Sequence, residues 1–536
     1  MLFMLLNSAL LSGGARVKVG EKYYVNEVKD LKGKVLKLSD NTTLVFSDRG
    51  KFVNGTIVGS NTKIRNAHAN CFGVTLSGSW DVTDISDEWF DKSRLADNTI
   101  IKNINGLQSD NIKQTLKIGR DYCLSLSKDF DTGLTISSNT KVLLKGVISI
   151  KGNSLERYNI LSINRKKNIE IEGGEIRGDV GKHRYIDGST SEWGFGVYLY
   201  RAQNIVITGL KSSFCTGDGF YISGPGSKIG DYSTASRDIH LKKCVVYENR
   251  REGISLVHVD GVLIEDCESI NMGQTEYTAP SYGINIEPHK DKGARNVVIR
   301  RYKSVNTKAE MSFSSGGYHV ENGIGNRENV VLEDCVMDKG VAIMSSAVRL
   351  INCKMSRVVI YPMVMPDEKV TFKNCTIAGD NGLYINGKKK VTADSKNIPS
   401  YTFDNCMIAP AVAYKYNPGM LWGTDLGNVS AVFKFVGCDI RLPQNEKSYN
   451  LIASGFHSSF RFENCRIHSE AYPLKTNGAS FKGCSIDCQY VDGDQYAANG
   501  KSEFSNCTVR TYHSSKKVQN EKGLNILSNN RFVRAK

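Results

Sequence analysis

Residues 370–377 read VTFKNCTI, and the same pattern returns as YTFDNCMI at 401–408, FRFENCRI at 460–467 and SEFSNCTV at 502–509. The shared order is apolar residues alternating with polar ones, then a turn-forming residue, the cysteine, and an apolar residue two places later. Such alternation is typical of a strand with one buried face. Each copy therefore predicts a short strand, a sharp corner and a second short strand.

The pattern recurs at solenoid spacing. From Cys335 onward, successive cysteines are 18, 22, 31, 32, 27, 19 and 23 residues apart. Repeats of about 20 to 50 residues indicate a solenoid, in which each coil buries its apolar face against its neighbours. Ten of the 14 cysteines follow the pattern: Cys244, Cys267, Cys335, Cys353, Cys375, Cys406, Cys438, Cys465, Cys484 and Cys507.

The residue before each of these cysteines predicts the corner. It is asparagine at five of the ten positions, and aspartate, glycine or, once, lysine at the others. Asparagine, aspartate and glycine tolerate the left-handed backbone conformation that a one-residue corner needs. We expect the cysteines to form a buried column of free thiols. Because adjacent coils are about 4.8 Å apart, disulfide bridging between them is the alternative. The sequence contains no CxxC pair, so its cysteine spacing does not suggest a zinc site.

A second recurring strand begins with glycine. It reads GVYL from Gly196, GFYI from Gly219, GISL from Gly253, GINI from Gly283 and GYHV from Gly317. Together with the corner strands, it predicts coils of three short strands, an all-β right-handed parallel β-helix. We expect an apolar N-terminal segment at 1–14 and a less regular part of the β-helix at 15–160. The central β-helix then spans 161–345, and cysteine-bearing coils with an end cap span 346–536.

Composition narrows the class of protein. The 536 residues carry a formal net charge of +15, with 23% charged and 40% hydrophobic residues. That balance excludes a disordered tail and a membrane protein. The positive excess favours an anionic partner, but no arginine-rich arm or recognised motif points to nucleic acid.

Two segments of the N-terminal part leave alternatives open. Residues 1–11, MLFMLLNSALL, suggest either a truncated secretory signal or a structural N-terminus, and they are too short to span a bilayer. Residues 80–91, WDVTDISDEWFD, suggest either a loop that packs Trp89 and Phe90 against the coil or a calcium site. The segment lacks the glycine and ligand order of an EF-hand loop.

The coils, the Asn-Cys corners and GTIVGSNTKI at 55–64 resemble the pectate-lyase-like parallel β-helix superfamily over about residues 40 to 510. EWGFGVYL at 192–199, TGDGFYI at 216–222, NRREGISL at 249–256 and YGINIEP at 282–288 are similar to segments of β-helix proteins of gut bacteria and their phages. The superfamily includes polysaccharide lyases, polygalacturonase-type hydrolases and phage tailspike depolymerases. The resemblance implies a monomer, as in secreted lyases, or a homotrimer, as in tailspikes.

The superfamily's known mechanisms do not transfer to this chain. It lacks the paired-aspartate and Gly-His-Gly signatures of polygalacturonases. The calcium-binding aspartates and catalytic arginine of pectate lyases also find no match by spacing. The resemblance therefore implies the fold and leaves the reaction open.

Aligning the glycine-led strands places candidate catalytic carboxylates on one face. Asp218 and Glu252 fall in the same column of neighbouring coils, where their Cα atoms should be about 5 Å apart. A pair at that separation suits a retaining glycosidase and raises one pKa, which creates an acid beside a base. Glu287, beside His289, is a third candidate acid or base. The structural alternatives are turn amides for Asp218, an Arg251 partner for Glu252 and a loop-holding role for Glu287.

Candidate sugar-binding side chains share that face. Aromatic rings stack on the apolar side of a pyranose, while arginine and amide groups bond its acid groups and hydroxyls. Solvated loop arginines and purely structural tyrosines are the alternatives. The predicted binding residues are Trp193, Tyr198, Tyr221, Arg250, Arg251, Asn285, His289 and His319.

These residues predict an extracellular enzyme, a hydrolase or a lyase, that cleaves an anionic or capsular polysaccharide. The alternatives are a non-catalytic glycan-binding adhesin or phage tail component, and a purely structural rod. We expect no cofactor; calcium is the remaining option. The expected location is secreted, at the cell surface or on a phage virion tail.

Overall fold

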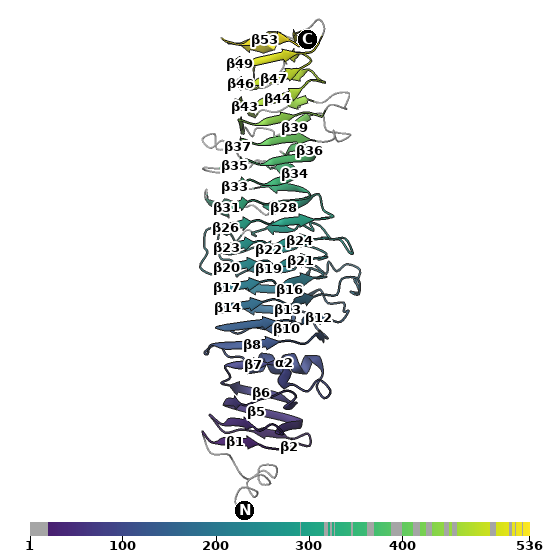
Figure 1. Cartoon of the computed structure of the whole chain (residues 1–536), viewed down its shortest axis with the longest axis vertical. Coiled ribbons are helices and arrows are strands. Elements are labelled where there is room, and N and C mark those ends of the chain that lie inside the picture. The colour runs from purple at the N-terminus through teal and green to yellow at the C-terminus, as the bar shows by residue number, and fades with distance from the viewer. Residues whose placement is uncertain are drawn as a thin grey trace, which may run out of the picture. The chain divides into compact units, whose positions relative to one another are not determined.

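The strands of this computed structural model are mostly short, and nearly all of them pair in parallel (Figure 1). The structure describes residues 20–289, 291–315, 320–321, 324–325, 327–344, 347–361, 369–386, 399–410, 419–424, 431–443, 450–452, 458–476, 478–493, 500–513, 517–519, 521–527 and 529–535. The predicted apolar segment 1–14 and the predicted site residue His319 lie outside these ranges.

The chain forms two compact units, each with its own buried core. The first comprises the residues up to Gly224 with Ser236–Ile254 and Gly273–Thr278. The second comprises Pro225–Ala235, Ser255–Met272 and the residues from Ala279 onward.

The first unit begins with a parallel sheet around one long strand. Strands β2, β3, β4 and β6 all pair with β5, and β1 pairs with β4. Their bounds are β1 (Lys22–Val25), β2 (Val28–Asp30), β3 (Val35–Lys37), β4 (Thr43–Phe46), β5 (Lys51–Arg65) and β6 (Phe72–Trp80).

The first unit continues as coils of three strands, as predicted. One sheet holds β7 (Asp84–Ser86), β8 (Gln114–Ile118), β11 (Thr140–Leu144), β14 (Lys167–Glu172), β17 (Gln203–Thr208) and β20 (Ser236–Lys242). A second holds β9 (Tyr122–Leu124), β12 (Val147–Ile150), β15 (Glu175–Arg177), β18 (Lys211–Ser213) and β21 (Val245–Tyr247). A third holds β10 (Asp131–Thr135), β13 (Arg157–Asn164), β16 (Trp193–Tyr200) and β19 (Phe220–Ser223).

The second unit winds mainly through two long runs of parallel strands. One run of parallel strands is β23 (Val259–Glu265), β26 (Ala294–Arg300), β31 (Arg327–Glu333), β33 (Val348–Ile351), β35 (Lys369–Lys373), β37 (Ser400–Asp404), β40 (Val432–Val436), β43 (Ser459–Glu463), β46 (Ser480–Lys482), β49 (Ser502–Ser505) and β52 (Leu524–Ile526). Another is β25 (Ile284–Ile286), β28 (Met311–Ser315), β32 (Gly340–Ile343), β34 (Lys354–Ile360), β36 (Thr376–Asn386), β38 (Met407–Pro410), β39 (Gly419–Thr424), β41 (Asp439–Arg441), β42 (Asn450–Ile452), β44 (Arg466–Ser469), β47 (Ser485–Cys488), β50 (Thr508–Thr511) and β53 (Arg531–Arg534).

Several shorter elements complete the chain. In the second unit β24 pairs with β27, β29 with β30, and β48 with both β45 and β51, while β22 lies where the two units meet in sequence. Their bounds are β22 (Ile254–Leu256), β24 (Glu268–Ile270), β27 (Lys303–Val305), β29 (Val320–Glu321), β30 (Ile324–Gly325), β45 (Leu474–Lys475), β48 (Val491–Asp492), β51 (Val518–Gln519) and the 3-10 turn η2 (Glu521–Gly523).

The predicted one-residue corners are confirmed. All ten residues before the patterned cysteines have φ between 51° and 64°, the left-handed region. In the second unit, Asn405 Nδ2 donates to Asn374 Oδ1 at 2.8 Å, and Asn374 Nδ2 donates to Asn352 Oδ1 at 3.2 Å. An asparagine ladder therefore links corners of successive coils.

The cysteine column is also as expected, with all ten patterned cysteines buried as free thiols. Cys406 Sγ, for example, donates to Asp404 O of its own coil and to Phe372 O of the preceding coil, at 3.5 and 3.4 Å. Beside the column, aromatic rings stack from coil to coil at centroid distances of 4.5 to 5.0 Å, running Phe372, Phe403, Phe435, Phe462, Phe481 and Phe504. Each coil thus buries its interior against its neighbours.

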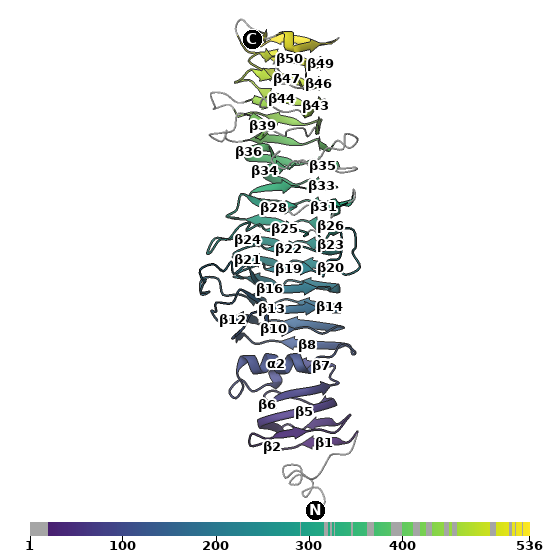
Figure 2. The ribbon, with the colours of Figure 1, turned by 180° about the vertical axis from the view of Figure 1, so that it is seen from behind.

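The N-terminal region adds a helix that we did not predict, α2 (Asp97–Leu107), visible beside β7 in Figures 1 and 2. Its buried residues Ile100, Ile101, Ile104 and Leu107 follow the three-to-four spacing of one helical face. The segment 80–91 forms β7 and the 3-10 turn η1 (Asp87–Trp89), and it buries Phe90 against Phe72. Phe90 therefore packs against the coil as the loop interpretation predicts.

Candidate functional site

Parallel aromatic rings cover the outer face of β16 and β19 in the first unit. The register pairs Tyr198 with Tyr221, and their rings stack at 5.8 Å with 4° between the planes. Tyr221 also stacks on Phe195 at 4.4 Å, and Tyr198 on Tyr200 at 5.6 Å. Burial and the neighbouring hydroxyls of Tyr221 and Tyr200 raise the pKa of Tyr198, so its hydroxyl stays a proton donor.

The rings of Phe195, Tyr198 and Tyr221 line a pocket of about 190 Å³. Trp193 and Arg157 stand side by side at its rim, because the register pairs the first residues of β13 and β16. The pocket is lined by Phe130, Arg157, Tyr158, Asn159, Trp193, Phe195, Tyr198 and Tyr221, and we call it the aromatic pocket. The structure therefore brings together the three aromatic residues predicted for sugar binding.

Sequence reasoning missed Phe130 and Arg157 in this pocket. They come from β13 and the turn before β10, whose strands lack the leading glycine by which we aligned the others. The alternating segment RYNILSIN at 157–164 was the available signal, since it pairs in register with WGFGVYLY at 193–200.

The predicted catalytic carboxylates of the first unit meet at Arg251. Gly219 N donates to Glu252 O at 2.9 Å and Phe220 N donates to Gly253 O at 2.9 Å, so Asp218 and Glu252 align in adjacent coils. Both side chains are fully buried. Arg251 Nη1 lies 3.0 Å from Asp218 Oδ1 and 3.4 Å from Glu252 Oε2.

A third carboxylate, Glu192, completes this cluster. Its Oε2 lies 3.8 Å from Arg251 Nε, and its Oε1 accepts a hydrogen bond from Thr278 Oγ1 at 3.3 Å. With 29% of its side chain exposed, Glu192 is the carboxylate of the cluster that solvent reaches. It directly precedes Trp193 in the chain, which sets the cluster next to the aromatic pocket. We call Glu192, Asp218, Arg251 and Glu252 the acidic cluster.

Arg250 turns away from that cluster. Its Nη1 donates to Thr190 O and Ser191 O at 2.9 and 3.3 Å, and its guanidinium lies 4.6 Å from the ring centroid of Tyr185. The side chain therefore holds the loop between β15 and β16 in place.

The remaining predicted residues lie in the second unit. Asn285 Nδ2 donates to Glu287 Oε2 at 2.8 Å, which brings a predicted binding residue and a predicted catalytic residue together. Asn285 is buried, Glu287 half-buried and His289 exposed. His289 O accepts a hydrogen bond from Lys292 N at 3.0 Å, which closes the turn after β25.

A buried histidine–aspartate pair lies behind the aromatic pocket, and sequence reasoning missed it. His183 Nδ1 is 2.9 Å from Asp179 Oδ2, and Tyr158 OH donates to Asp179 Oδ1 at 2.7 Å. Both residues of the pair have fully buried side chains. Because Tyr158 also lines the pocket, this network fixes the pocket floor. We found no sequence signal for it, since both residues come from an irregular loop.

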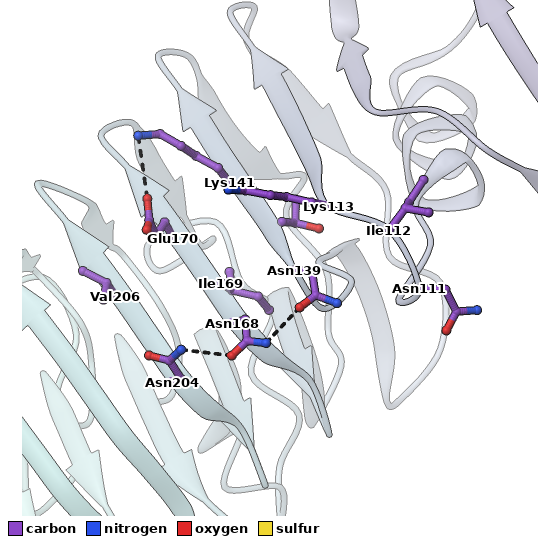
Figure 3. A pocket seen from close by; sticks show the side chains of 11 residues that line it. Asn111, Ile112, Lys113, Asn139, Lys141, Asn168, Ile169, Glu170, Asn204 and Val206 are labelled. Atoms are coloured by element: carbon purple, nitrogen blue, oxygen red, sulfur yellow. Dashed lines mark hydrogen bonds and ion pairs between the residues drawn. The ribbon is translucent and has the colours of Figure 1, made fainter.

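A larger, polar groove of about 500 Å³ lies on the β11, β14 and β17 face of the first unit (Figure 3). Its floor is an asparagine ladder: Asn168 Nδ2 donates to Asn139 Oδ1 at 2.8 Å, and Asn204 Nδ2 donates to Asn168 Oδ1 at 2.9 Å. Lys141 is paired with Glu172 at 2.6 Å and lies 3.7 Å from Glu170. Since these groups already bond one another, the aromatic pocket is the better candidate site despite its smaller size.

One group in the second unit has the composition of a metal site. Ligand atoms of His468, Glu470 and Asp487 lie within 4.8 Å of one another. Arg510 also lies 3.3 Å from Asp487, and His468 lies 3.5 Å from Asp439. This outward column of β41, β44, β47 and β50 is explained by surface ion pairing between coils.

Two proteins of Bacillus subtilis share part of this sequence. The uncharacterized protein YclG of Bacillus subtilis (strain 168) is 30% identical over 200 residues, 35% of this chain and 34% of that protein. The SPbeta prophage-derived uncharacterized protein YorA of the same strain is 30% identical over 171 residues, 30% of this chain and 29% of that protein. The chain thus spans about a third of the length of these relatives.

Among solved structures, a tailspike protein of E. coli bacteriophage HK620 has a TM-score of 0.44 and 13% identity, covering 84% of this chain and 78% of that one. In the part of the chain that the structure describes, no helix is long and apolar enough to cross a membrane. Residues 124–300 match the family model described as a right handed beta helix region. Over these residues, the chain is similar to the right-handed β-helix family, in agreement with the coils of the structure.

Proposed function

We propose that the protein binds a polysaccharide at the aromatic pocket, and that it does so outside the cell. The observation that carries the proposal is the set of parallel rings on the outer face of β16 and β19, with Trp193 at its rim. Pyranose rings present apolar faces of C–H groups, which stack on aromatic rings, while their hydroxyls bond to groups such as the Tyr198 hydroxyl.

The size of the pocket suits part of a chain. About 190 Å³ is below the ~300 to 1,000 Å³ typical of pockets that enclose a drug-sized ligand. The pocket would therefore hold one sugar residue while the rest of the polysaccharide lies along the surface. We expect this binding step to need no metal or cofactor.

The test is a binding panel of neutral and acidic polysaccharides, measured by affinity electrophoresis and titration calorimetry. Trp193→Ala and Tyr198→Ala should each weaken binding about tenfold or more, as for buried aromatic anchors at other interfaces. Tyr24→Ala is the matched control, because Tyr24 is 47% exposed on β1, away from the pocket. Unchanged binding in both pocket variants would overturn the proposal.

Cleavage of the bound chain is the second candidate function, because the acidic cluster lies next to the pocket. Within it, Glu192 combines a solvent-accessible carboxylate with a position one residue before Trp193. We propose Glu192 as the general acid or base, with Asp218 and Glu252 acting through Arg251 to set its charge environment.

Cleavage is tested by following new reducing ends and ultraviolet absorbance on the same panel. A general acid or base contributes about 10²- to 10⁴-fold, so Glu192→Gln should lower the rate by at least about 100-fold. Glu88→Gln, an exposed glutamate in η1, is the control. Asp218→Asn and Glu252→Gln test the predicted pair, with circular dichroism to verify folding.

The readouts separate the remaining alternatives. New ends with absorbance would identify a lyase, and new ends without absorbance a hydrolase. Binding without cleavage across the panel would favour the adhesin or phage tail component. Light scattering would distinguish a 59.3 kDa monomer from a homotrimer.

A further inference from the structure

Arg157 stands at the rim of the aromatic pocket with its guanidinium held against two aromatic rings. Its Cζ lies 5.1 Å from the ring centroid of Trp193 and 5.4 Å from that of Phe130. The backbone on both sides is fixed, since Arg157 N donates to Asp129 Oδ1 at 3.1 Å and Phe130 N donates to Arg157 O at 2.8 Å. Cation–π contacts orient a guanidinium without using its N–H donors.

Phe130 occupies a costly position. Its φ is 64° and 71% of its surface is exposed, although a bulky residue at positive φ is an outlier. The surrounding turn holds it there, because Ser127 N donates to Asp131 Oδ2 at 2.9 Å and Asp131 N donates to Lys128 O at 3.1 Å. The turn therefore keeps the exposed ring of Phe130 beside the guanidinium of Arg157.

The guanidinium of Arg157 contacts aromatic rings rather than carboxylates. Across the described residues, no carboxylate lies within ion-pair distance of it, and Asp129 contacts its backbone N–H instead. The other two candidate arginines differ. Arg251 is surrounded by three carboxylates, and Arg250 bonds backbone carbonyls. Their guanidinium groups are therefore already engaged, whereas that of Arg157 is available to a ligand.

We propose that Arg157 binds the carboxylate of an acidic sugar residue whose ring stacks in the aromatic pocket. This inference rests on the proposed polysaccharide binding and adds the substrate class, a uronate-containing chain. The planar guanidinium offers parallel N–H donors that match the two oxygens of a carboxylate, and its two aromatic neighbours fix its plane. A neutral sugar would leave this oriented cation without a counter-charge.

The experiment compares binding of polygalacturonate and alginate, their carboxyl-reduced derivatives, and dextran sulfate to the full chain. The variants are Arg157→Gln, which removes the charge, and Arg157→Lys, which keeps the charge but loses the planar fork. Arg165→Gln is the matched control, since Arg165 is an exposed arginine just after the other end of β13. Circular dichroism verifies that each variant is folded.

We expect Arg157→Gln to weaken polyuronate binding about 10- to 100-fold, the range for a charge-assisted hydrogen-bond pair. The affinity of Arg157→Lys for polyuronates should lie between those of Arg157→Gln and the unmodified chain. Arg165→Gln should bind as tightly as the unmodified chain. Binding of the carboxyl-reduced polymers should be weaker and should not respond to Arg157→Gln.

Three results would overturn the inference, each in a different way. Equal binding of native and carboxyl-reduced polymers, unaffected by Arg157→Gln, would remove the acidic-sugar role and leave polysaccharide binding standing. Tighter, Arg157-dependent binding of dextran sulfate would replace the carboxylate with a sulfate. Failure of the unmodified chain to bind any polymer would overturn both this inference and the proposed function.

Discussion

Arg251 Nη1 lies 3.0 Å from both carboxylate oxygens of Asp218, whose side chain is fully buried. The same nitrogen lies 3.4 Å from Glu252 Oε2. A guanidinium that bridges two carboxylates in adjacent coils compensates charges that burial would otherwise make very unfavourable. Asp218, Arg251 and Glu252 therefore form one unit, in which the charge of Arg251 stabilises both buried carboxylates.

Replacing Arg251 should destabilise the first unit. Arg251→Gln leaves two buried carboxylates without their counter-charge, so we expect the free energy of unfolding to fall by about 3 to 5 kcal/mol. Chemical denaturation measures this change. In the double variant with Asp218→Asn, the loss should be smaller than the sum of the two single losses. Additive losses, or an Arg251→Gln variant as stable as the parent, would contradict the bridging role.

Replacing a corner asparagine by alanine should lower the free energy of unfolding more than replacing it by glycine. Asn405 has φ 51° and donates to Asn374 at 2.8 Å. Asn405→Gly loses the hydrogen bond, at about 1 kcal/mol, while Asn405→Ala also incurs the left-handed backbone cost of about 1 to 2 kcal/mol. Unfolding free energies of the two variants should therefore differ. Equal values would mean that the corner conformation contributes nothing.

Thiol reactivity should separate one cysteine from the rest. Cys123 is exposed and the other 13 cysteines are buried. Burial also raises the pKa of Cys71, Cys215 and Cys488 to about 12, which leaves little thiolate to react. A chromogenic disulfide reagent should modify one thiol in the native protein and all 14 in urea. In Cys123→Ser, the number of thiols modified in the native protein should fall to zero. Disulfide bridges within the cysteine column would lower the number modified in urea.

Mild acid should destabilise the second unit through His258. Burial lowers the pKa of His258, and in the neutral ring Nδ1 can accept a hydrogen bond from Gly293 N at 3.1 Å. The unfolded chain binds a proton below about pH 6.5, whereas the folded chain binds it only at lower pH. Stability should therefore fall as the pH drops from about 6.5 toward the folded pKa.

The measurement for His258 is the unfolding midpoint between pH 7 and 5. His258→Asn retains an acceptor near the position of Nδ1 and cannot titrate, so it should flatten the pH dependence. Groups facing the ring include Lys292, whose charge lowers the pKa, and Asp231 and Asp291, whose charges raise it. An unchanged slope in His258→Asn would assign the pH dependence to one of the other groups.

The sequence predicted those parts of the site that follow from strand alternation within adjacent coils. Tyr198 and Tyr221 share a column because each lies two residues after a glycine that leads its strand, and their rings stack as that alignment implies. Asp218 and Glu252 align for the same reason. The contact of Arg251 with Glu252 was one of the alternatives that we considered, and the structure shows it. Its contact with Asp218 was not predicted, because side-chain direction next to a corner does not follow the two-residue period.

The rest of the pocket depends on loops of variable length. Phe130 and Arg157 lie 27 positions apart in the sequence, and Arg157 meets Trp193 only because 35 intervening residues return the chain to the next coil. Periodicity gives no measure of where such a loop returns. The buried pair of Asp179 and His183 lies within one of these irregular segments, which explains why it had no detectable pattern.

By itself, the sequence determined the coil: left-handed corners at residues such as Asn374 and Asn405, inward apolar positions and a column of buried cysteines. These features are local, since they depend on backbone preference and on a period of two. Only the tertiary structure decided which charges meet. It placed Arg251 against the buried carboxylate of Asp218 and Arg157 against the rings of Phe130 and Trp193, because these partners come from neighbouring coils and loops whose return the local pattern does not set.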